Sequence, residues 1–111
     1  MKAILIAATL LISVCGSAQA ITGAKLAQEK QCMQCHAIDR DTIGPSFQKI
    51  KAIYQTMKNP QAKLIDVMRN GSDAHLGALT GRARMPDSSE RPALSDREAR
   101  QLARWILSLK T

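Results

Sequence analysis

The 111-residue chain is basic, with 16 Lys and Arg residues against 9 Asp and Glu residues and a formal net charge of +7 at pH 7. Such a surface favours acidic partners. The interleaved aromatic residues typical of nucleic-acid binding are missing, which argues against a nucleic-acid partner. Aromatic residues make up only 3% of the chain. A domain of this size gains little stability from its own core, so we expect a bound group to fill its interior.

The first 20 residues have the pattern of a secretory signal. Lys2 precedes an apolar run over residues 3–14, and small residues close the segment. This pattern predicts a signal peptide over residues 1–20, cleaved on export to the periplasm, and a single domain over residues 21–111. The run is shorter than the ~20 residues that span a bilayer, and we expect no transmembrane segment. A lipid anchor on Cys15 is less favoured because no small residue precedes it.

Three helices are predicted in the first half of the domain. Residues 21–31 form a short helix candidate with weak periodicity. Phe47, Ile50 and Tyr54 then recur at helical spacing. A third helix is expected over residues 59–71, where Asn and Pro supply the start and Asn-Gly the stop.

The second half contains a long loop and one helix. Glycines, prolines and serines accumulate over residues 71–94, which predicts a functional loop. Ser95 and Glu98 then form a capping box, and the apolar stripe that follows predicts a helix. No segment alternates with period two for long enough to make a strand. The expected fold class is therefore all-α, with a few helices joined by long loops.

Cys32, Cys35 and His36 form the C-x-x-C-H pattern of c-type haem attachment. Residues three and four apart share one side of a helical turn, so two thiols can reach the haem vinyl groups while the imidazole reaches the iron. A structural zinc site needs four protein ligands, and only His75 is left among the later His and Cys residues. A thioredoxin-like pair needs strands, and a plain disulfide does not explain the histidine. The pattern indicates one covalently bound haem c and its iron.

The sixth iron ligand is predicted to be Met85. It precedes a proline in the long loop, which can reach across the haem, and thioethers are known haem ligands. His75 is the chief rival, and an open iron site is the third alternative. The other methionines of the domain are more easily read as part of the attachment turn, a helix or the core: Met33, Met57 and Met68.

These motifs together resemble the small class I bacterial cytochromes c over residues 25–110. The most specific matches are residues 32–39, Gly44-Pro45, residues 69–72, Met85-Pro86 and residues 94–108. The resemblance implies a class I cytochrome c fold, with four or so helices and long loops around one haem, ligated by His36 and Met85. It also implies that the Pro45 carbonyl accepts a hydrogen bond from His36, that the N- and C-terminal helices cross, and that Trp105 lies in the core.

The chain departs from that family in its loops. A tryptophan common near a haem propionate is replaced around His75, and an Asn-type residue after Met-Pro is replaced by Asp87 and Ser88. The loops on both sides of the methionine look longer, over residues 79–84 and 88–92. Each of three residues in the altered loop can donate a hydrogen bond to a propionate; a solvated surface cluster is the competing interpretation. The three residues are His75, Arg82 and Arg84.

The resemblance implies a periplasmic electron carrier whose haem cycles between ferric and ferrous states, and not an enzyme. Acidic redox proteins are the expected partners, guided by basic residues of the Met85 loop and by Lys49, Lys51 and Lys58. We expect a monomer or weak dimer. One alternative is the cytochrome subunit of a larger periplasmic oxidoreductase. Another is a haem peroxidase or gas sensor with an open iron site.

Overall fold

The computed structural model describes residues 21–72 and 84–110. These residues contain four α-helices and one 3-10 turn, and no strand lies among them. The elements are α1 (Gly23–Glu29), η1 (Cys32–Gln34), α2 (Phe47–Tyr54), α3 (Pro60–Asn70) and α4 (Asp96–Ser108). The predicted all-α class is confirmed. No helix in this part of the chain is long and apolar enough to cross a membrane. The predicted signal peptide over residues 1–20 lies outside the described residues.

Side-chain caps explain where three of the helices begin. Thr22 Oγ1 accepts from the backbone N–H of the third residue of α1 at 3.2 Å. Ser46 Oγ does the same for α2 at 3.0 Å. The predicted capping box of α4 is present, because Ser95 Oγ accepts from Glu98 N at 3.1 Å and Glu98 Oε1 accepts from Ser95 N at 3.0 Å. Each cap satisfies N–H groups that have no partner within their helix.

The start of α3 differs from the sequence expectation. Asn59 precedes the helix as predicted, but its side chain makes no capping hydrogen bond. Its φ of 54° places it in the left-handed region, which asparagine tolerates better than most residues. Asn59 therefore reverses the chain ahead of Pro60, whose fixed φ suits the first turn of a helix. The predicted stop at Gly71 is observed, with a φ of 87°.

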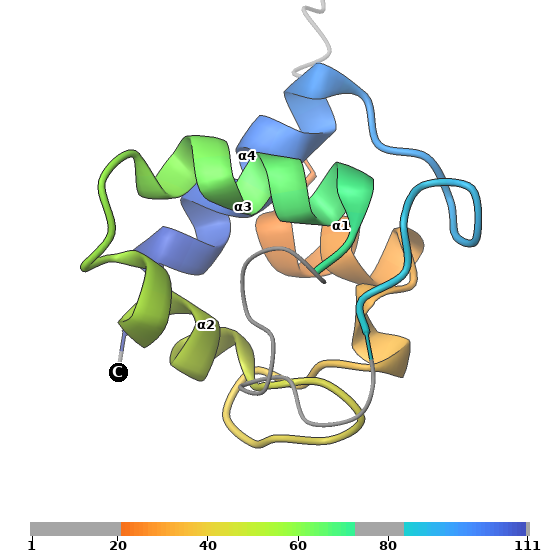
Figure 1. Ribbon diagram of the computed structural model, residues 1–111. Helices are drawn as coiled ribbons and strands as arrows, with labels where there is room; N and C mark the ends of the chain where they lie inside the picture. Colours follow the sequence, from red (N-terminus) through yellow and green to blue (C-terminus); the bar gives the residue numbers. More distant parts are fainter. Residues whose placement is uncertain (1–20, 73–83, 111) are drawn as a thin grey trace, which may run out of the picture.

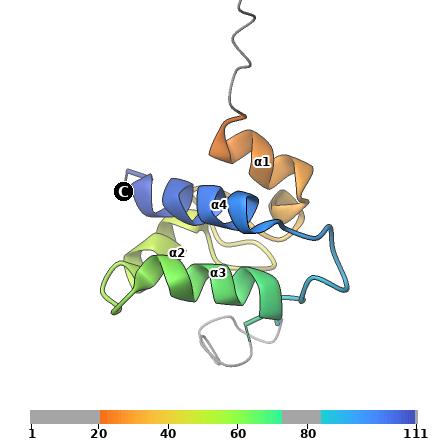
Figure 2. The same ribbon diagram turned by 90° about the horizontal axis from the view of Figure 1, so that it is seen from above.

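Helix α4 is the centre of the arrangement. It contacts α1, α2 and α3 (Figure 1), and α1 lies on one side of it while α2 and α3 lie on the other (Figure 2). Its buried face carries Ala99, Leu102, Ala103 and Ile106. The small residues allow close approach, and the larger ones fill the core with side chains from the other helices: Leu26, Ala27, Phe47, Ile50, Tyr54, Leu64, Val67 and Met68.

Trp105 links α1, α2 and α4. The indole is partly buried against the core, and its ring lies 5.0 Å from that of Phe47 in an edge-to-face arrangement with an interplanar angle of 66°. A Cβ atom at Gly23 would overlap the Trp105 side chain at its Cβ and at indole atoms Cγ and Cδ1. The absence of a side chain at Gly23 therefore allows α1 to cross α4, as the family resemblance implies.

We expect Gly23→Ala to destabilise the protein by about 1–3 kcal/mol, the usual cost of overpacking. At an open helical position the same change stabilises by ~0.5–1 kcal/mol, so contact with Trp105 reverses the sign. Thermal unfolding monitored by circular dichroism measures the effect, at roughly 4–8 °C per kcal/mol for a domain of this size. Gln28→Ala, at an exposed position of the same helix, is the control. A Gly23→Ala protein as stable as the wild type would contradict this packing.

Candidate cofactor-binding cleft

The C-x-x-C-H segment forms one tight turn directly after α1. Gln31 has a φ of 63° and ends the helical path. The carbonyl oxygen of Cys32 then accepts hydrogen bonds from both Cys35 N, at 3.2 Å, and His36 N, at 3.0 Å. The turn is of the 3-10 type, tighter than the α-helical turn that the spacing suggests. It places both thiols and the imidazole in the lining of one cleft, and both cysteines are free.

His36 is fixed in orientation by the loop that follows it. Its Nδ1 lies 2.6 Å from the Pro45 carbonyl oxygen. A carbonyl oxygen only accepts, so Nδ1 carries the proton and Nε2 keeps its lone pair. Burial lowers the pKa of His36 below its usual value, and the bond to Pro45 counteracts part of this shift. The ring is therefore a neutral imidazole with Nε2 available to a metal ion.

Gly44 allows the loop to close over the imidazole. Its N–H donates to the Cys35 carbonyl oxygen at 2.7 Å, and a Cβ atom there would lie 2.7 Å from His36 Cε1. Phe47, at the start of α2, covers the ring with its centroid 5.2 Å away. The Gly44-Pro45 pair noted in the sequence thus has a direct role in holding His36.

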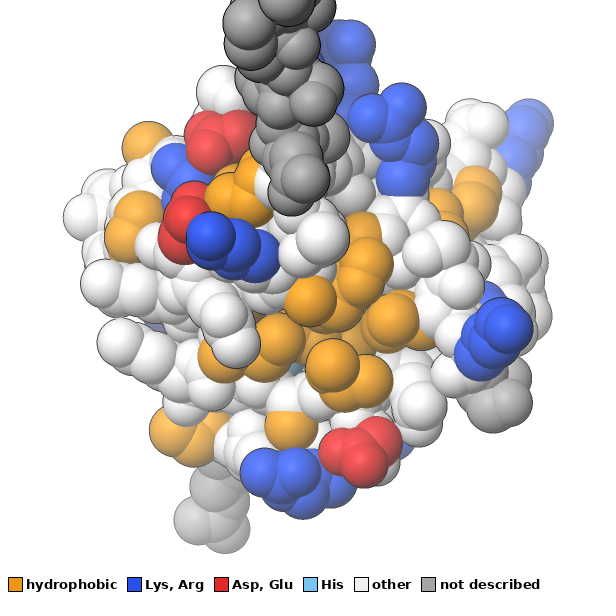
Figure 3. Space-filling view, turned by 180° about the vertical axis from the view of Figure 1, so that it is seen from behind, with side chains coloured by type: hydrophobic (Ala, Val, Ile, Leu, Met, Phe, Trp, Pro, Cys, Tyr) orange, Lys and Arg blue, Asp and Glu red, His pale blue; other side chains and the backbone are white. Residues whose placement is uncertain are grey.

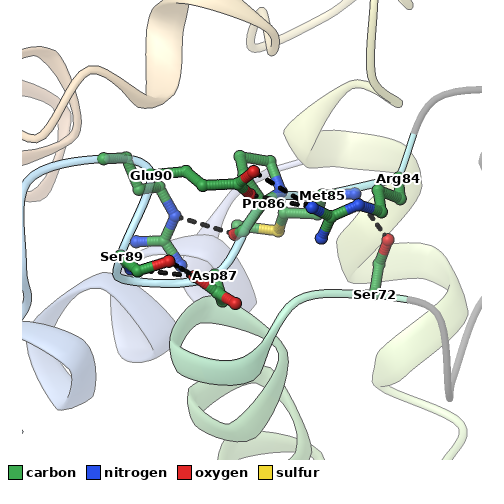
Figure 4. Close-up of polar contacts among 8 residues, drawn as sticks. Ser72, Arg84, Met85, Pro86, Asp87, Ser89 and Glu90 are labelled. Atoms are coloured by element: carbon green, nitrogen blue, oxygen red, sulfur yellow. Dashed lines mark hydrogen bonds and ion pairs between the residues drawn. The ribbon is translucent and has the colours of Figure 1, made fainter.

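Met85 is held by the C-terminal end of α3. Its backbone N–H donates to Ser72 Oγ at 2.7 Å, and Ser72 is only 2% exposed. A Cβ atom at Gly71 would lie 2.7 Å from the Met85 carbonyl oxygen, so glycine is required by this close approach as well as by its φ. Figure 4 shows the Ser72 hydroxyl directed at the backbone of the loop that contains Met85, with the Met85 sulfur on the side away from Ser72. The long loop therefore presents Met85 at a defined place in the cleft lining.

Arg69 of α3 anchors the segment that follows Met85. Its carbonyl oxygen accepts from Ser88 N at 3.1 Å. Its guanidinium donates to the Leu94 carbonyl oxygen at 3.3 Å and pairs with Asp96 at 2.7 Å. One residue of α3 thus fixes the loop in its middle and at its end, where α4 begins.

The cleft encloses about 1200 Å³ of space not filled by atoms, part of it open to solvent. Cys32, Cys35 and His36 line it together with Met85. Its remaining walls are largely apolar and come from all parts of the core, including Phe47, Ile50, Leu64, Val67, Met68, Leu94, Leu102 and Ile106. Such a cleft suits a large flat apolar group that reacts with thiols and carries a metal ion.

Two polar groups in the cleft lining were not found from the sequence. The hydroxyl of Tyr54 and Nη2 of Arg91 are buried and have no hydrogen-bond partner among the described residues, and both residues line the cleft. Tyr54 falls at a core position in the helical periodicity, so the sequence alone does not show that its hydroxyl lies in the cleft lining. Arg91 lies in the segment of residues 88–92, which the resemblance predicts to be longer than in the family, and this is the signal that could have indicated it.

The predicted polar contacts of the altered loop are only partly described. His75 and Arg82 lie outside the described residues. Arg84 lines the cleft but is exposed, and its Nη2 pairs with both carboxylate oxygens of Glu90, at 3.1 and 3.0 Å (Figure 4). Its guanidinium is therefore already engaged.

Comparison with known proteins gives a consistent picture. The family model for cytochrome c matches residues 20–110. Cytochrome c-551 of Pseudomonas aeruginosa is 35% identical over 85 residues, covering 77% of this chain and 74% of its own. Cytochrome c-552 of Nitrosomonas europaea is 34% identical over 97 residues, covering 87% and 85%.

Solved structures agree with the sequence relatives. The crystal structure of wild-type Nitrosomonas europaea cytochrome c552 superposes with a TM-score of 0.68 and 31% identity, covering 78% of this chain and 99% of that one. The helical fold, the cleft and the C-x-x-C-H turn of this chain are thus accompanied by clear sequence similarity to cytochromes c. The chain belongs to the class I cytochrome c family of electron carriers, close to the small bacterial cytochromes c-551 and c-552.

Proposed function

We propose that this protein is a periplasmic electron carrier with one haem, bonded through thioethers to Cys32 and Cys35 and ligated to iron by His36 and Met85. The observation that carries the proposal is the cleft, whose lining contains both free thiols, the imidazole and the thioether. When bound, the haem supplies a one-electron ferric–ferrous couple.

The residues of the cleft have separate tasks in this proposal. The Pro45 carbonyl holds the His36 ring and increases the basicity of Nε2 through the bond to Nδ1. Ser72 holds the backbone of Met85. The apolar walls exclude water, which favours the less charged ferrous state. The anchoring of Met85 supports a six-coordinate carrier over an open-site peroxidase or gas sensor.

Export is part of the same proposal. The predicted signal peptide over residues 1–20 supports transfer to the periplasm, and bacterial members of this family are typically periplasmic. Family membership supports a carrier rather than an enzyme.

We further propose that acidic redox proteins dock beside the cleft. Ile43 lines the cleft and is 64% exposed, and Ile38, five residues earlier in the chain, is 40% exposed. Figure 3 shows apolar side chains gathered on one face of the molecule, with more Lys and Arg than Asp and Glu side chains around them. Lys49 is engaged by Asp41 at 2.7 Å and Lys51 by the Leu109 carbonyl. An apolar contact with a basic surround suits a small, transient complex.

The first test is the optical spectrum of the exported protein, oxidised and reduced. We expect a low-spin c-type spectrum with the weak red band of methionine-ligated ferric haem. Met85→Leu removes the thioether and abolishes the band. Met68→Leu changes a second methionine of the same cleft and is expected to retain it.

Each outcome of the spectra decides one part of the proposal. A protein without haem would refute the function as a whole. A red band that persists in Met85→Leu would refute Met85 as ligand. Ready binding of carbon monoxide by the wild type would favour an open iron site instead.

We expect the haem-free protein to be largely unfolded. The cleft lies among the helices, and without haem its apolar walls are exposed to water. The free energy of binding haem therefore contributes to the free energy of folding, as it does for structural metal sites. Cys32→Ala/Cys35→Ala, which cannot form thioethers, provides the haem-free chain. Far-ultraviolet circular dichroism should show a large loss of helix. Full native helicity would contradict this expectation.

Electron transfer to an acidic partner should slow as salt is added, because exposed charges are screened beyond a Debye length of ~8 Å at physiological ionic strength. An acidic blue-copper protein serves as the probe in stopped-flow measurements. A neutral quinone is the control reactant, and its rate should change little. Lys58→Gln, at an exposed position, should reduce the salt dependence. A rate independent of salt would exclude electrostatic steering.

A further inference from the structure

Arg91 places a guanidinium group within the cleft. The residue lines the cleft, and its Nη2 is buried without a hydrogen-bond partner among the described residues. Burial lowers the pKa of Arg91 below its usual value, yet an arginine in a protein keeps its proton. The cleft therefore contains a permanent positive charge.

A hydrogen bond places this charge beside Met85, the proposed iron ligand. Arg91 Nε donates to the Pro86 carbonyl oxygen at 3.1 Å, one residue from Met85. Cys32 lines the same cleft as Arg91, and the charge of Arg91 counteracts part of the rise that burial causes in the pKa of the Cys32 thiol. The hydrogen bond to Pro86 places the guanidinium on the Met85 side of the cleft.

A neighbouring carboxylate offsets part of this field. Asp87 is the acidic residue whose charge acts on Arg91, and its Oδ1 accepts from Ser89 N at 2.8 Å and from Ser89 Oγ at 2.5 Å. Asp87 is unchanged in a variant of Arg91, so replacing Arg91 still removes one positive charge from the cleft. Arg84, the other cation among the described residues of the loop, is exposed and paired with Glu90. Of these two, Arg91 is the one with a buried nitrogen, Nη2, that has no hydrogen-bond partner.

We propose that Arg91 raises the reduction potential of the iron centre by placing a fixed positive charge on the Met85 side of the cleft. The ferric state carries one more positive charge than the ferrous state, so a nearby cation favours the ferrous state. This inference rests on the proposed function. It also assigns a role to the lengthened segment after Met85, where Asp87 and Ser88 replace the amide residue of the family.

The test is the midpoint potential of the haem protein, measured by spectroelectrochemistry. Two unit charges about 10 Å apart at an effective dielectric constant of ~20 change an equilibrium constant roughly tenfold. We therefore expect Arg91→Gln to shift the ferric–ferrous equilibrium about tenfold toward ferric, which is a fall of about 59 mV for one electron. Arg91→Lys, which keeps the positive charge, should have a midpoint potential close to that of the wild type. Arg84→Gln, which removes a paired exposed charge, should change it much less.

Salt and pH separate a buried charge from other causes. The fall in Arg91→Gln should largely persist at high ionic strength, because partly buried charges are screened much less than exposed ones. A fall that disappears with salt, or one matched by Arg84→Gln, would overturn the proposal. Haem carboxylates stand on the pyrroles that carry no thioether. A fall that appears only as a carboxylate ionises would assign Arg91 to such a group and overturn its direct action on iron.

The red band shows whether Met85 remains bound in each variant. If Arg91→Gln loses the band, Arg91→Met provides an uncharged side chain of similar length for the same measurement. Loss of the band in both, with retention in Arg91→Lys, would make Arg91 a support for Met85 and refute the proposal. If the wild type contains haem but Arg91→Gln has the same potential, this inference alone is refuted. If the wild type contains no haem, the proposed function is refuted.

Discussion

The hydrogen bond from His36 Nδ1 to the Pro45 carbonyl oxygen, 2.6 Å long, joins the chemistry of the cleft to the packing of the helices. It sets the tautomer of the imidazole, and it holds the loop that contains Pro45 against the C-x-x-C-H turn. Phe47 follows at once, covers the imidazole and starts α2. The same Phe47 ring meets Trp105 of α4. A side chain proposed to bind iron is therefore connected through two aromatic contacts to the helix around which the fold is built.

The opposite wall depends on a different part of the chain. Gly71 and Ser72 end α3 and receive the backbone of Met85, while Arg69 of the same helix holds the loop at Ser88 and Leu94. Because α3 packs on α4, the two walls share one support. The distance across the cleft is thus set by helix packing, although neither His36 nor Met85 lies within a helix.

Local signals account for what could be predicted from the sequence. The capping box of α4 involves residues three apart, and the C-x-x-C-H turn involves five consecutive residues, so both could be recognised without tertiary information. The prediction for Asn59 was wrong in detail, because an asparagine can either cap a helix with its side chain or adopt a left-handed φ. The neighbouring residues do not decide between these two possibilities. Tyr54 and Arg91 escaped notice because their unpartnered atoms become evident only when distant segments enclose the cleft.

The loop after Met85, which the resemblance predicts to be longer than in the family, is held mainly by contacts within itself and by α3. Many of its contacts are local: Arg84 with Glu90, Ser89 with Asp87, and Arg91 with Pro86. An exposed ion pair such as Arg84–Glu90 contributes only ~0–1 kcal/mol, and the entropic cost of closing a loop rises slowly with its length. The anchors on and directly after α3 therefore determine where Met85 lies, because they hold the loop at Met85, Ser88 and Leu94. The residues between Ser88 and Leu94 make few contacts with α3, so they can change what surrounds the thioether without moving it, and one of them, Arg91, brings a cation into the cleft lining.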